Sequence, residues 1–85
     1  MNKKFAITEK VTSISKQPLV EIIGKRRVLI ENHSGITEMS NDRITASNDG
    51  GNIVITGKDL QLVMMSVDQI VVVGQIESVL LDAAV

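Results

Sequence analysis

The groups best suited to catalysis in this chain lie beside one predicted turn, at Glu31, His33 and Ser34. A carboxylate, an imidazole and a hydroxyl are the groups of a hydrolytic triad, in which the histidine takes a proton from the nucleophile. A triad depends on geometry, and nearly consecutive turn residues cannot supply that geometry by themselves. We therefore interpret His33 as an exposed turn residue and predict that the protein is not an enzyme, with a hydrolytic or small ligand-binding β domain as an alternative.

The aspartates are spread over turns and do not predict a metal site. Asp42, Asp49, Asp59 and Asp68 each fall in a predicted turn, where aspartate is favoured because its side chain bonds the local backbone. The segment 48–51, Asn-Asp-Gly-Gly, lacks the following helix and the Lys-Ser/Thr pair of a phosphate-binding loop. It predicts a hairpin turn instead, so we expect no metal ion and no cofactor.

One cluster of positive charge stands out, at Lys25, Arg26 and Arg27. Together with the lysines of residues 1–17 it is a candidate basic patch for anionic lipid or an acidic partner. Alternation along a strand would point Arg26 away from Lys25 and Arg27, which weakens such a patch. Charged residues also protect edge strands from unwanted pairing, and we favour that interpretation. A peripheral membrane adaptor is the alternative function that this cluster supports.

The overall composition excludes several classes of protein. Nine basic and ten acidic residues give a net charge of -1, and there is one Phe with no Trp or Tyr. The chain therefore has neither the basic excess nor the stacking aromatics of nucleic-acid-binding proteins. The absence of cysteine favours a reducing cytoplasm, and no apolar run is long enough to span a membrane. The 85 residues allow one domain with a thin aliphatic core, whose stability we expect a partner to share.

Short strands separated by turns must position these residues. From Leu19 onward, turn-forming clusters cut the chain into runs of Ile, Val, Leu and Met that are too short for amphipathic helices. The pattern predicts an all-β fold, a small antiparallel β-sandwich of about 7–8 short strands, with a meander or a β-solenoid as alternatives. Pro18 separates this domain, residues 18–85, from residues 1–17, which we expect to be a flexible N-terminal arm.

The predicted turns recur with a regular spacing. Their centres fall near residues 24, 41, 57 and 74, about every 17 residues. In the last predicted strand, apolar residues alternate with one parity up to Ile76 and with the other parity from Val79. This change predicts a β-bulge or a bend between Gly74 and Ser78.

A second apolar face is predicted on two neighbouring strands. If Leu62 and Met64 point into the core, the residues that alternate with them point to the opposite face. We predict an interaction surface there, and its members are Val63, Met65, Val71 and Val73. Either another part of the chain or a second protein must cover this surface, and a homodimer or an edge-to-edge homo-oligomer is our first hypothesis.

Three segments carry the pattern of a known family. They are 30–36, Ile-Glu-Asn-His-Ser-Gly-Ile; 53–60, Ile-Val-Ile-Thr-Gly-Lys-Asp-Leu; and 70–79, Ile-Val-Val-Val-Gly-Gln-Ile-Glu-Ser-Val. In their order and spacing these segments resemble the YabP/YqfC family of sporulation proteins, and its YqfC branch most closely. Family members often carry an aromatic residue where this chain has Met39 and again near Leu80-Leu81, so the packing detail is expected to differ.

The resemblance implies a function as well as a fold. It implies a small β-sandwich domain without enzymatic activity, made in the mother cell of an endospore-forming bacterium and needed for spore development. It also implies protein–protein contacts, with a membrane protein of sporulation as one partner. We therefore expect an interaction or assembly component in the mother-cell cytoplasm, and a peripheral position at the forespore membrane is the second expectation.

Overall fold

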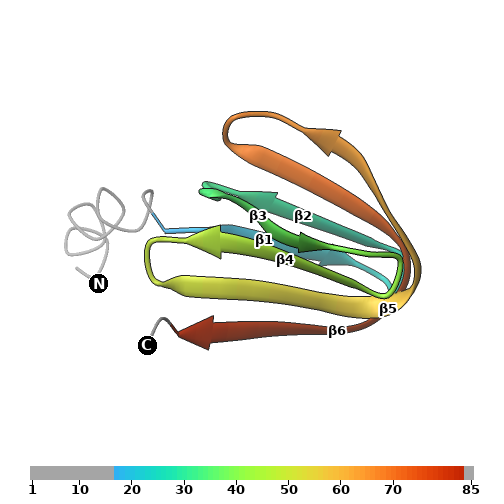
Figure 1. Ribbon diagram of the computed structural model, residues 1–85. Helices are drawn as coiled ribbons and strands as arrows, with labels where there is room; N and C mark the ends of the chain where they lie inside the picture. The colour runs from blue at the N-terminus through green and yellow to red at the C-terminus, as the bar shows by residue number, and fades with distance from the viewer. Residues whose placement is uncertain (1–16, 84–85) are drawn as a thin grey trace, which may run out of the picture.

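The protein forms six β-strands and no helix within residues 17–83, the part of the chain that the computed structural model describes (Figure 1). The strands are β1 (Leu19–Ile23), β2 (Arg27–Glu31), β3 (Gly35–Met39), β4 (Arg43–Asn48), β5 (Gly51–Met65) and β6 (Gln69–Ala83). The predicted all-β class is confirmed, and the first four strands match runs between predicted turns. Apart from Gln17, the predicted N-terminal arm lies outside the described residues.

All six strands belong to one antiparallel sheet. Its strand order is β1-β2-β6-β5-β4-β3, and every neighbouring pair is antiparallel. The parallel rungs of a β-solenoid do not occur among these strands. The predicted sandwich of two sheets is not confirmed either, because β5 and β6 run through both parts of one continuous sheet.

The predicted count of about 7–8 strands is not confirmed within residues 17–83, because two predicted turns are bends inside strands. β5 and β6 each contain 15 residues, and they curve together at the right of Figure 1, the bend end of the molecule. The segment 57–59, Gly-Lys-Asp, was expected to end a strand but lies within β5. Glycine and aspartate permit either a turn or a bulge, and continued pairing with β6 selects the bulge.

An extra residue in β6 produces the predicted parity change. Thr56 pairs with Ser78, but the next residue, Gly57, pairs with Ile76, so Glu77 has no partner of its own in the ladder. Two residues of β6 then oppose one residue of β5, which is the definition of a β-bulge. The bulge predicted within this interval is confirmed.

Two glycines allow the long strands to approach closely at the bend. A Cβ atom at Gly57 would overlap the carbonyl oxygen of Gln75, and a Cβ at Gly74 would lie 2.7 Å from the carbonyl oxygen of Asp59. Gly74 also has a φ of 144°, a conformation that favours glycine. Only glycine therefore fits at these two positions, where β5 and β6 cross.

The turn between β1 and β2 is attached to β6 at the bend. The carbonyl oxygen of Lys25 accepts a hydrogen bond from the Ile76 N–H at 2.8 Å, and that of Arg26 accepts one from the Gly74 N–H at 3.1 Å. The first hairpin therefore closes onto the start of the second half of β6.

The turn between β3 and β4 is attached to β5 in the same way. The carbonyl oxygen of Asn41 accepts a hydrogen bond from the Leu60 N–H at 2.8 Å, and that of Asp42 accepts one from the Gly57 N–H at 3.1 Å. The two attachments are related by an approximate two-fold symmetry within the chain. The four predicted turn centres thus meet at one end of the molecule, which explains their recurrence about every 17 residues.

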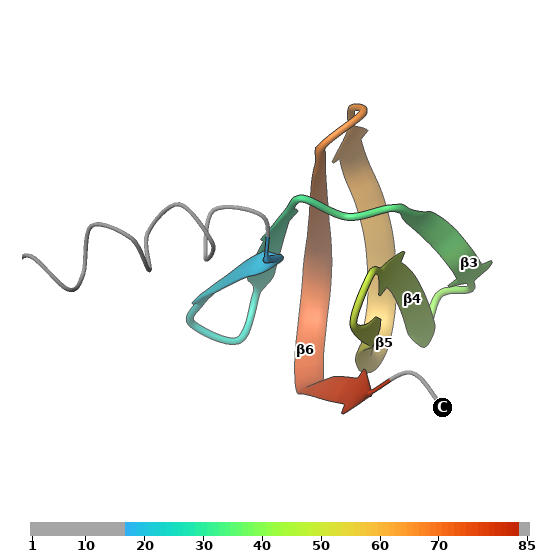
Figure 2. The ribbon, with the colours of Figure 1, turned by 90° about the vertical axis from the view of Figure 1, so that its left-hand side faces the viewer.

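The bend divides the sheet into two sides, which Figure 2 shows from the end opposite the bend. Side 1 contains β1, β2, residues 69–73 of β6 and residues 61–65 of β5. Side 2 contains β3, β4, residues 51–56 of β5 and residues 78–83 of β6. Each long strand belongs to both sides, so the sides cannot separate without breaking β5 and β6.

One aliphatic core lies between the two sides. Side 1 contributes Val28, Ile30, Ile70 and Val72, side 2 contributes Ile44, Ala46, Ile53 and Ile55, and the bend contributes Leu60 and Ile76. Their exposed fractions range from 0% to 9%, so this packing carries most of the apolar burial of the fold. None of the described residues forms a helix long and apolar enough to cross a membrane.

A candidate interaction face

The outer face of side 1 is apolar although it faces away from the core. Cross-strand pairing places Leu29 and Val71 side by side at its centre, with Met64 next to Val71. Leu19 and Ile23 lie at its β1 edge and are 51% and 54% exposed. Met64 is 38% exposed, whereas Leu29 and Val73 are half-buried and Val71 is buried among its neighbours. A set of apolar side chains exposed around such a centre on one sheet face is typical of a surface that another molecule covers. We call this set face 1, and its apolar members are Leu19, Ile23, Leu29, Met64, Val71 and Val73.

The predicted interaction residues agree with face 1 in part. Val71 and Val73 lie on it, because they pair with Leu29 and Arg27 of β2. Met65 does not lie on face 1 although it is 50% exposed, so its predicted placement on the same face as Val71 and Val73 is wrong. The predicted binding role of these residues stays a prediction. Met65 pairs with Ile70, whose side chain is in the core.

A bulge explains the error. Leu62 pairs with Val72, but Met64 pairs with Val71, so Val63 is an extra residue in β5. The bulge shifts the alternation by one position, which moves Met64 onto face 1 and Met65 onto the inner face. Val63 itself is 52% exposed at the bulge.

Four apolar residues of face 1 were absent from the sequence prediction: Leu19, Ile23, Leu29 and Met64, which was expected to point into the core. Leu19 and Ile23 lie two strand positions on either side of Glu21, and Leu29 pairs with Glu21 in the neighbouring strand. The i, i+2 spacing in β1 is visible in the sequence. The pairing of β2 with β6, which places Leu29 beside Val71, joins segments far apart in the chain and has no local signal.

The outer face of side 2 is polar by comparison. At the positions that correspond to Leu19, Leu29 and Val73 of face 1, side 2 carries Gly35, Thr45 and Thr56. Two further apolar residues there, Val54 and Leu80, lie in one cross-strand row with Thr45. The two outer faces therefore have the same backbone plan and different chemistry.

The charged residues of the two outer faces also differ. On side 2, the Arg43 Nε lies 3.1 Å from Glu38 Oε1, and the Thr45 hydroxyl donates a hydrogen bond to the same oxygen at 3.0 Å. Glu21 and Arg27 occupy the corresponding positions on face 1, where Leu29 replaces the threonine. Within residues 17–83, neither Glu21 nor Arg27 forms an ion pair.

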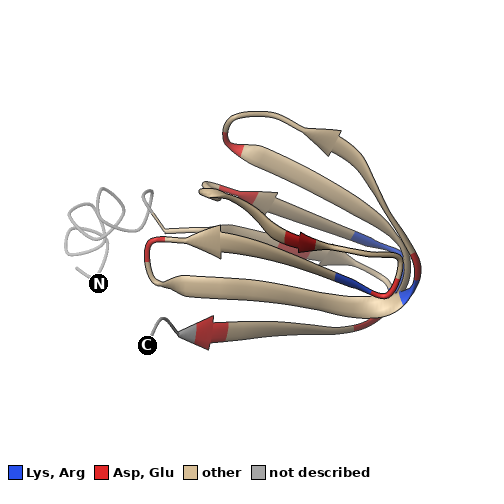
Figure 3. Cartoon of the chain, viewed as in Figure 1, with Lys and Arg blue, Asp and Glu red and all other residues tan. Residues whose placement is uncertain are grey.

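The predicted basic patch lies at the bend end. Lys25 and Arg26 form the turn between β1 and β2, and Arg27 begins β2 on face 1. In Figure 3 the basic segments gather at this end and are interleaved with acidic ones. Since their backbone carbonyls anchor β6, Lys25 and Arg26 have a structural role whatever their side chains bind.

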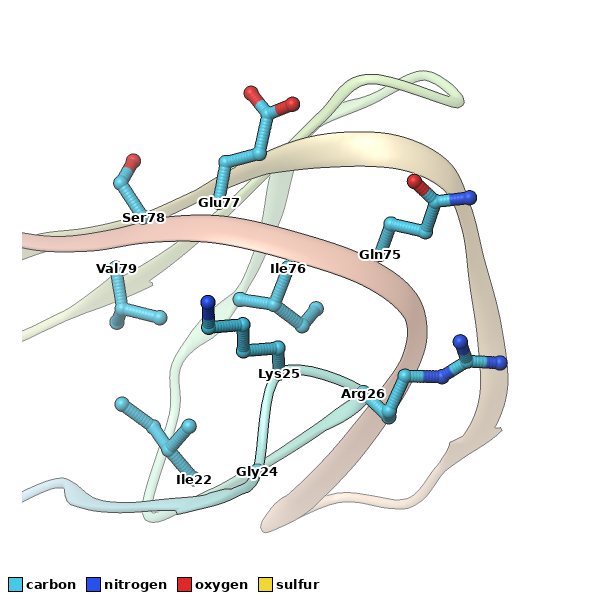
Figure 4. Close-up of a pocket in the computed structure, with 9 residues that line it drawn as sticks. All are labelled: Ile22, Gly24, Lys25, Arg26, Gln75, Ile76, Glu77, Ser78 and Val79. Carbon is cyan, nitrogen blue, oxygen red and sulfur yellow. The ribbon is translucent and has the colours of Figure 1, made fainter.

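A groove of about 740 Å³ runs beside this turn, between β1 and the second half of β6. Figure 4 shows Ile22, Ile76 and Val79 pointing toward one another across it, while Glu77 and Ser78 point away. From the β1–β2 turn, the Lys25 side chain extends between the apolar side chains of Ile22 and Ile76. The groove is lined partly by residues at the edge of the core, Ile76 and Val79. Its lining residues do not form a catalytic arrangement.

The structure does not bring Glu31, His33 and Ser34 together as a triad. Glu31 Oε2 accepts a hydrogen bond from Gln69 Nε2 at 2.9 Å. His33 Nε2 lies 3.0 Å from the Ser66 carbonyl oxygen, which requires the proton on Nε2. His33 therefore ties the connection between the two sides to the β5–β6 turn. Its other ring nitrogen, Nδ1, is buried without a hydrogen-bond partner among the described residues, so it bonds neither the Glu31 carboxylate nor the Ser34 hydroxyl.

The aspartate side chains of two turns bond their own turns. Ser40 donates a hydrogen bond to Asp42 at 2.7 Å, and Ser66 donates one to Asp68 at 3.2 Å. The predicted hairpin turn at 49–50 is present between β4 and β5, with the Gly50 N–H bonded to the Asn48 side chain. Within the described residues, no cluster of His, Asp or Glu is suited to hold a metal ion.

The fold and face 1 together define the chain as a small all-β domain with an exposed apolar sheet face. The model of the YabP family matches residues 15–83. This is most of the chain, so the protein belongs to the YabP family. The resemblance to the YabP/YqfC family drawn from the three sequence segments is confirmed, and the closer likeness to the YqfC branch stays a prediction. Membership suggests a sporulation-related protein. No curated protein and no solved structure matches the chain.

Proposed function

We propose that the protein is a non-enzymatic assembly component of spore formation that acts through protein–protein contacts on face 1. Membership of the YabP family supports the link with sporulation. The observation that carries the proposed mode of action is the apolar outer face of side 1, whose equivalent on side 2 is polar. If both outer faces were only in contact with water, side 1 would be expected to carry polar side chains on its outer face, as side 2 does.

The site of action that we propose is the mother cell of an endospore-forming bacterium. The partner is a second copy of the chain or a sporulation protein held in a membrane. In the second case the protein would work as a peripheral component, with the cations of the bend end near the membrane surface. No catalytic step is part of this proposal.

Spore formation by a strain carrying a face 1 variant tests the proposal. Ile23→Lys places a charge on face 1, and Leu80→Lys is the matched control, because Leu80 is 56% exposed on the outer face of side 2 and Ile23 is 54% exposed. We expect heat-resistant spore counts of the Ile23→Lys strain to fall toward those of a deletion strain. The Leu80→Lys strain should form spores normally, and immunoblots should show equal amounts of both variants.

Two results would contradict the proposal at different points. Normal sporulation of the deletion strain would remove the role in spore formation. A sporulation defect on deletion, combined with normal spore counts for Ile23→Lys, would keep that role but exclude face 1 as the surface that performs it.

A further inference from the structure

The exposed apolar side chains of face 1 are suited to binding a partner, and the charges on the same face indicate which one. We propose that face 1 binds face 1 of a second copy of this chain, in a two-fold symmetric dimer held by reciprocal Glu21–Arg27 ion pairs. This inference rests on the proposed function in using the same face, and it adds the identity and the geometry of the occupant.

The register of the strands makes face 1 complementary to itself. Residues on one face are about 6.7 Å apart along a strand, and neighbouring strands are about 4.8 Å apart. On this grid, Leu29 and Val71 are cross-strand neighbours at the centre. A two-fold axis that lies in the plane of the interface, runs diagonally to the strands and passes midway between Leu29 and Val71 exchanges the position of Glu21 with that of Arg27.

The same axis matches the apolar residues at the two ends of face 1. It exchanges the position of Leu19 on β1 with that of Val73 on β6, so each of these residues meets the other in the second copy. Leu29 and Val71 flank the axis, so both lie close to their own counterparts at the centre of the interface. Since two-fold dimers use one surface patch twice, a patch whose charges and apolar groups exchange in this way is suited to such an interface.

Within the described part of the chain, two charged side chains of face 1 are unpaired, unlike their equivalents on side 2. Side 2 places Glu38 and Arg43 in the equivalent positions, and there they pair within the molecule. On face 1, Glu21 and Arg27 are exposed and form no ion pair within residues 17–83. Opposed sheet faces pack about 10 Å apart, a separation that a glutamate and an arginine side chain can bridge together.

Charge reversal tests this geometry more directly than removal of apolar residues. In a dimer, Glu21→Arg would place two pairs of like charges in contact, and Arg27→Glu would do the same with opposite sign. We expect each variant to weaken dimerisation by about tenfold or more, since two contacts change in each dimer. A mixture of the two variants restores both ion pairs, so it should form a heterodimer with affinity close to that of the native dimer.

Sedimentation or light scattering across a wide concentration range measures this in solution. Glu38→Arg is the matched control, because it makes the same charge change at the equivalent position of side 2 and should leave the dimer intact. Circular dichroism verifies that each variant is folded. Supporting results are a native dimer, dissociation by each single reversal, and recovery on mixing.

Two results would overturn the inference, and both are distinguishable from failure of the proposed function. A native chain that stays monomeric up to about 1 mM has no such dimer. The role of face 1 toward another protein is then tested separately by the spore counts of the Ile23→Lys strain. A native dimer that survives both single reversals excludes the proposed geometry.

Discussion

Sides 1 and 2 of the sheet share a backbone plan and differ in what their outer faces carry. In both, a short hairpin closes onto a long bent strand through the carbonyl oxygens of two consecutive turn residues. In both, Ile and Val fill the inner face. The outer faces do not contribute to this core, and they differ: the outer face of side 1 is apolar and that of side 2 is polar. The fold is therefore specified by the inner faces and the bend, which leaves an outer face available for binding.

The equivalent positions show where the divergence lies. Val54 of side 2 corresponds to Val71 of side 1, and both are buried on their outer faces at 7% and 6% exposure. Around them, however, Thr45 takes the place of Leu29 and Thr56 the place of Val73. A few different residues around a common centre therefore decide whether a sheet face is adapted to water or to another apolar surface.

The largest effect is expected at the two bends that join the sides. Gly57→Ala and Gly74→Ala should each destabilise the protein by about 3 kcal/mol or more, because the new Cβ would meet the backbone of the opposite long strand. Thermal or urea unfolding measures this. If the two sides are built in the same way, the two variants should lose similar amounts of unfolding free energy.

Gly24→Ala is the control for these variants. Gly24 has a φ of 57°, but no atom lies within 4 Å of the Cβ that would be added. The substitution should therefore cost only about 1 kcal/mol, the strain of a left-handed residue. A loss at Gly57 or Gly74 no greater than at Gly24 would show that the strands do not cross as closely as described.

A medium effect is expected from equivalent isoleucines of the shared core. Ile53 on side 2 and Ile70 on side 1 are 1% and 0% exposed. Ile53→Ala and Ile70→Ala should each cost about 2–5 kcal/mol, through lost burial and the cavity that remains. Chemical denaturation gives both values, with Leu81→Ala, 68% exposed, as a control of small effect. A large loss for one isoleucine and a negligible loss for the other would contradict a single core shared by both sides.

The smallest effect is expected from the ion pair that distinguishes the outer faces. Arg43→Gln removes the pair with Glu38, whose side chains are about half exposed, and should cost about 0.2–1 kcal/mol. Arg27→Gln at the equivalent place on side 1 should leave the stability of the monomer unchanged. Unfolding at low protein concentration measures both, and the cost at Arg43 should shrink in 1 M salt. Equal costs at both sites would mean that Arg27 also has a partner within the chain.

The sequence predicted the parts of this fold that have a local signature. The strands from Leu19 to Asn48, the hairpin turn at 49–50 and the bulge before Val79 all follow from alternation and turn chemistry. The segment 57–59 was misread because glycine and aspartate suit turns and bulges alike. Met65 was placed on the wrong face because Val63 has no feature that marks it as a bulge residue.

By itself, the sequence determined the all-β class, the aliphatic core and the approximate places where the chain changes direction, because the period of two and the turn residues act over a few neighbours. Only the tertiary structure decided that β5 and β6 continue through their bends and that β6 pairs with β2. It also decided that Glu38 and Arg43 meet while Glu21 and Arg27 do not. These outcomes depend on which distant strands become neighbours, and each strand pairing is chosen by the burial of the whole inner face and not by the residues of one segment.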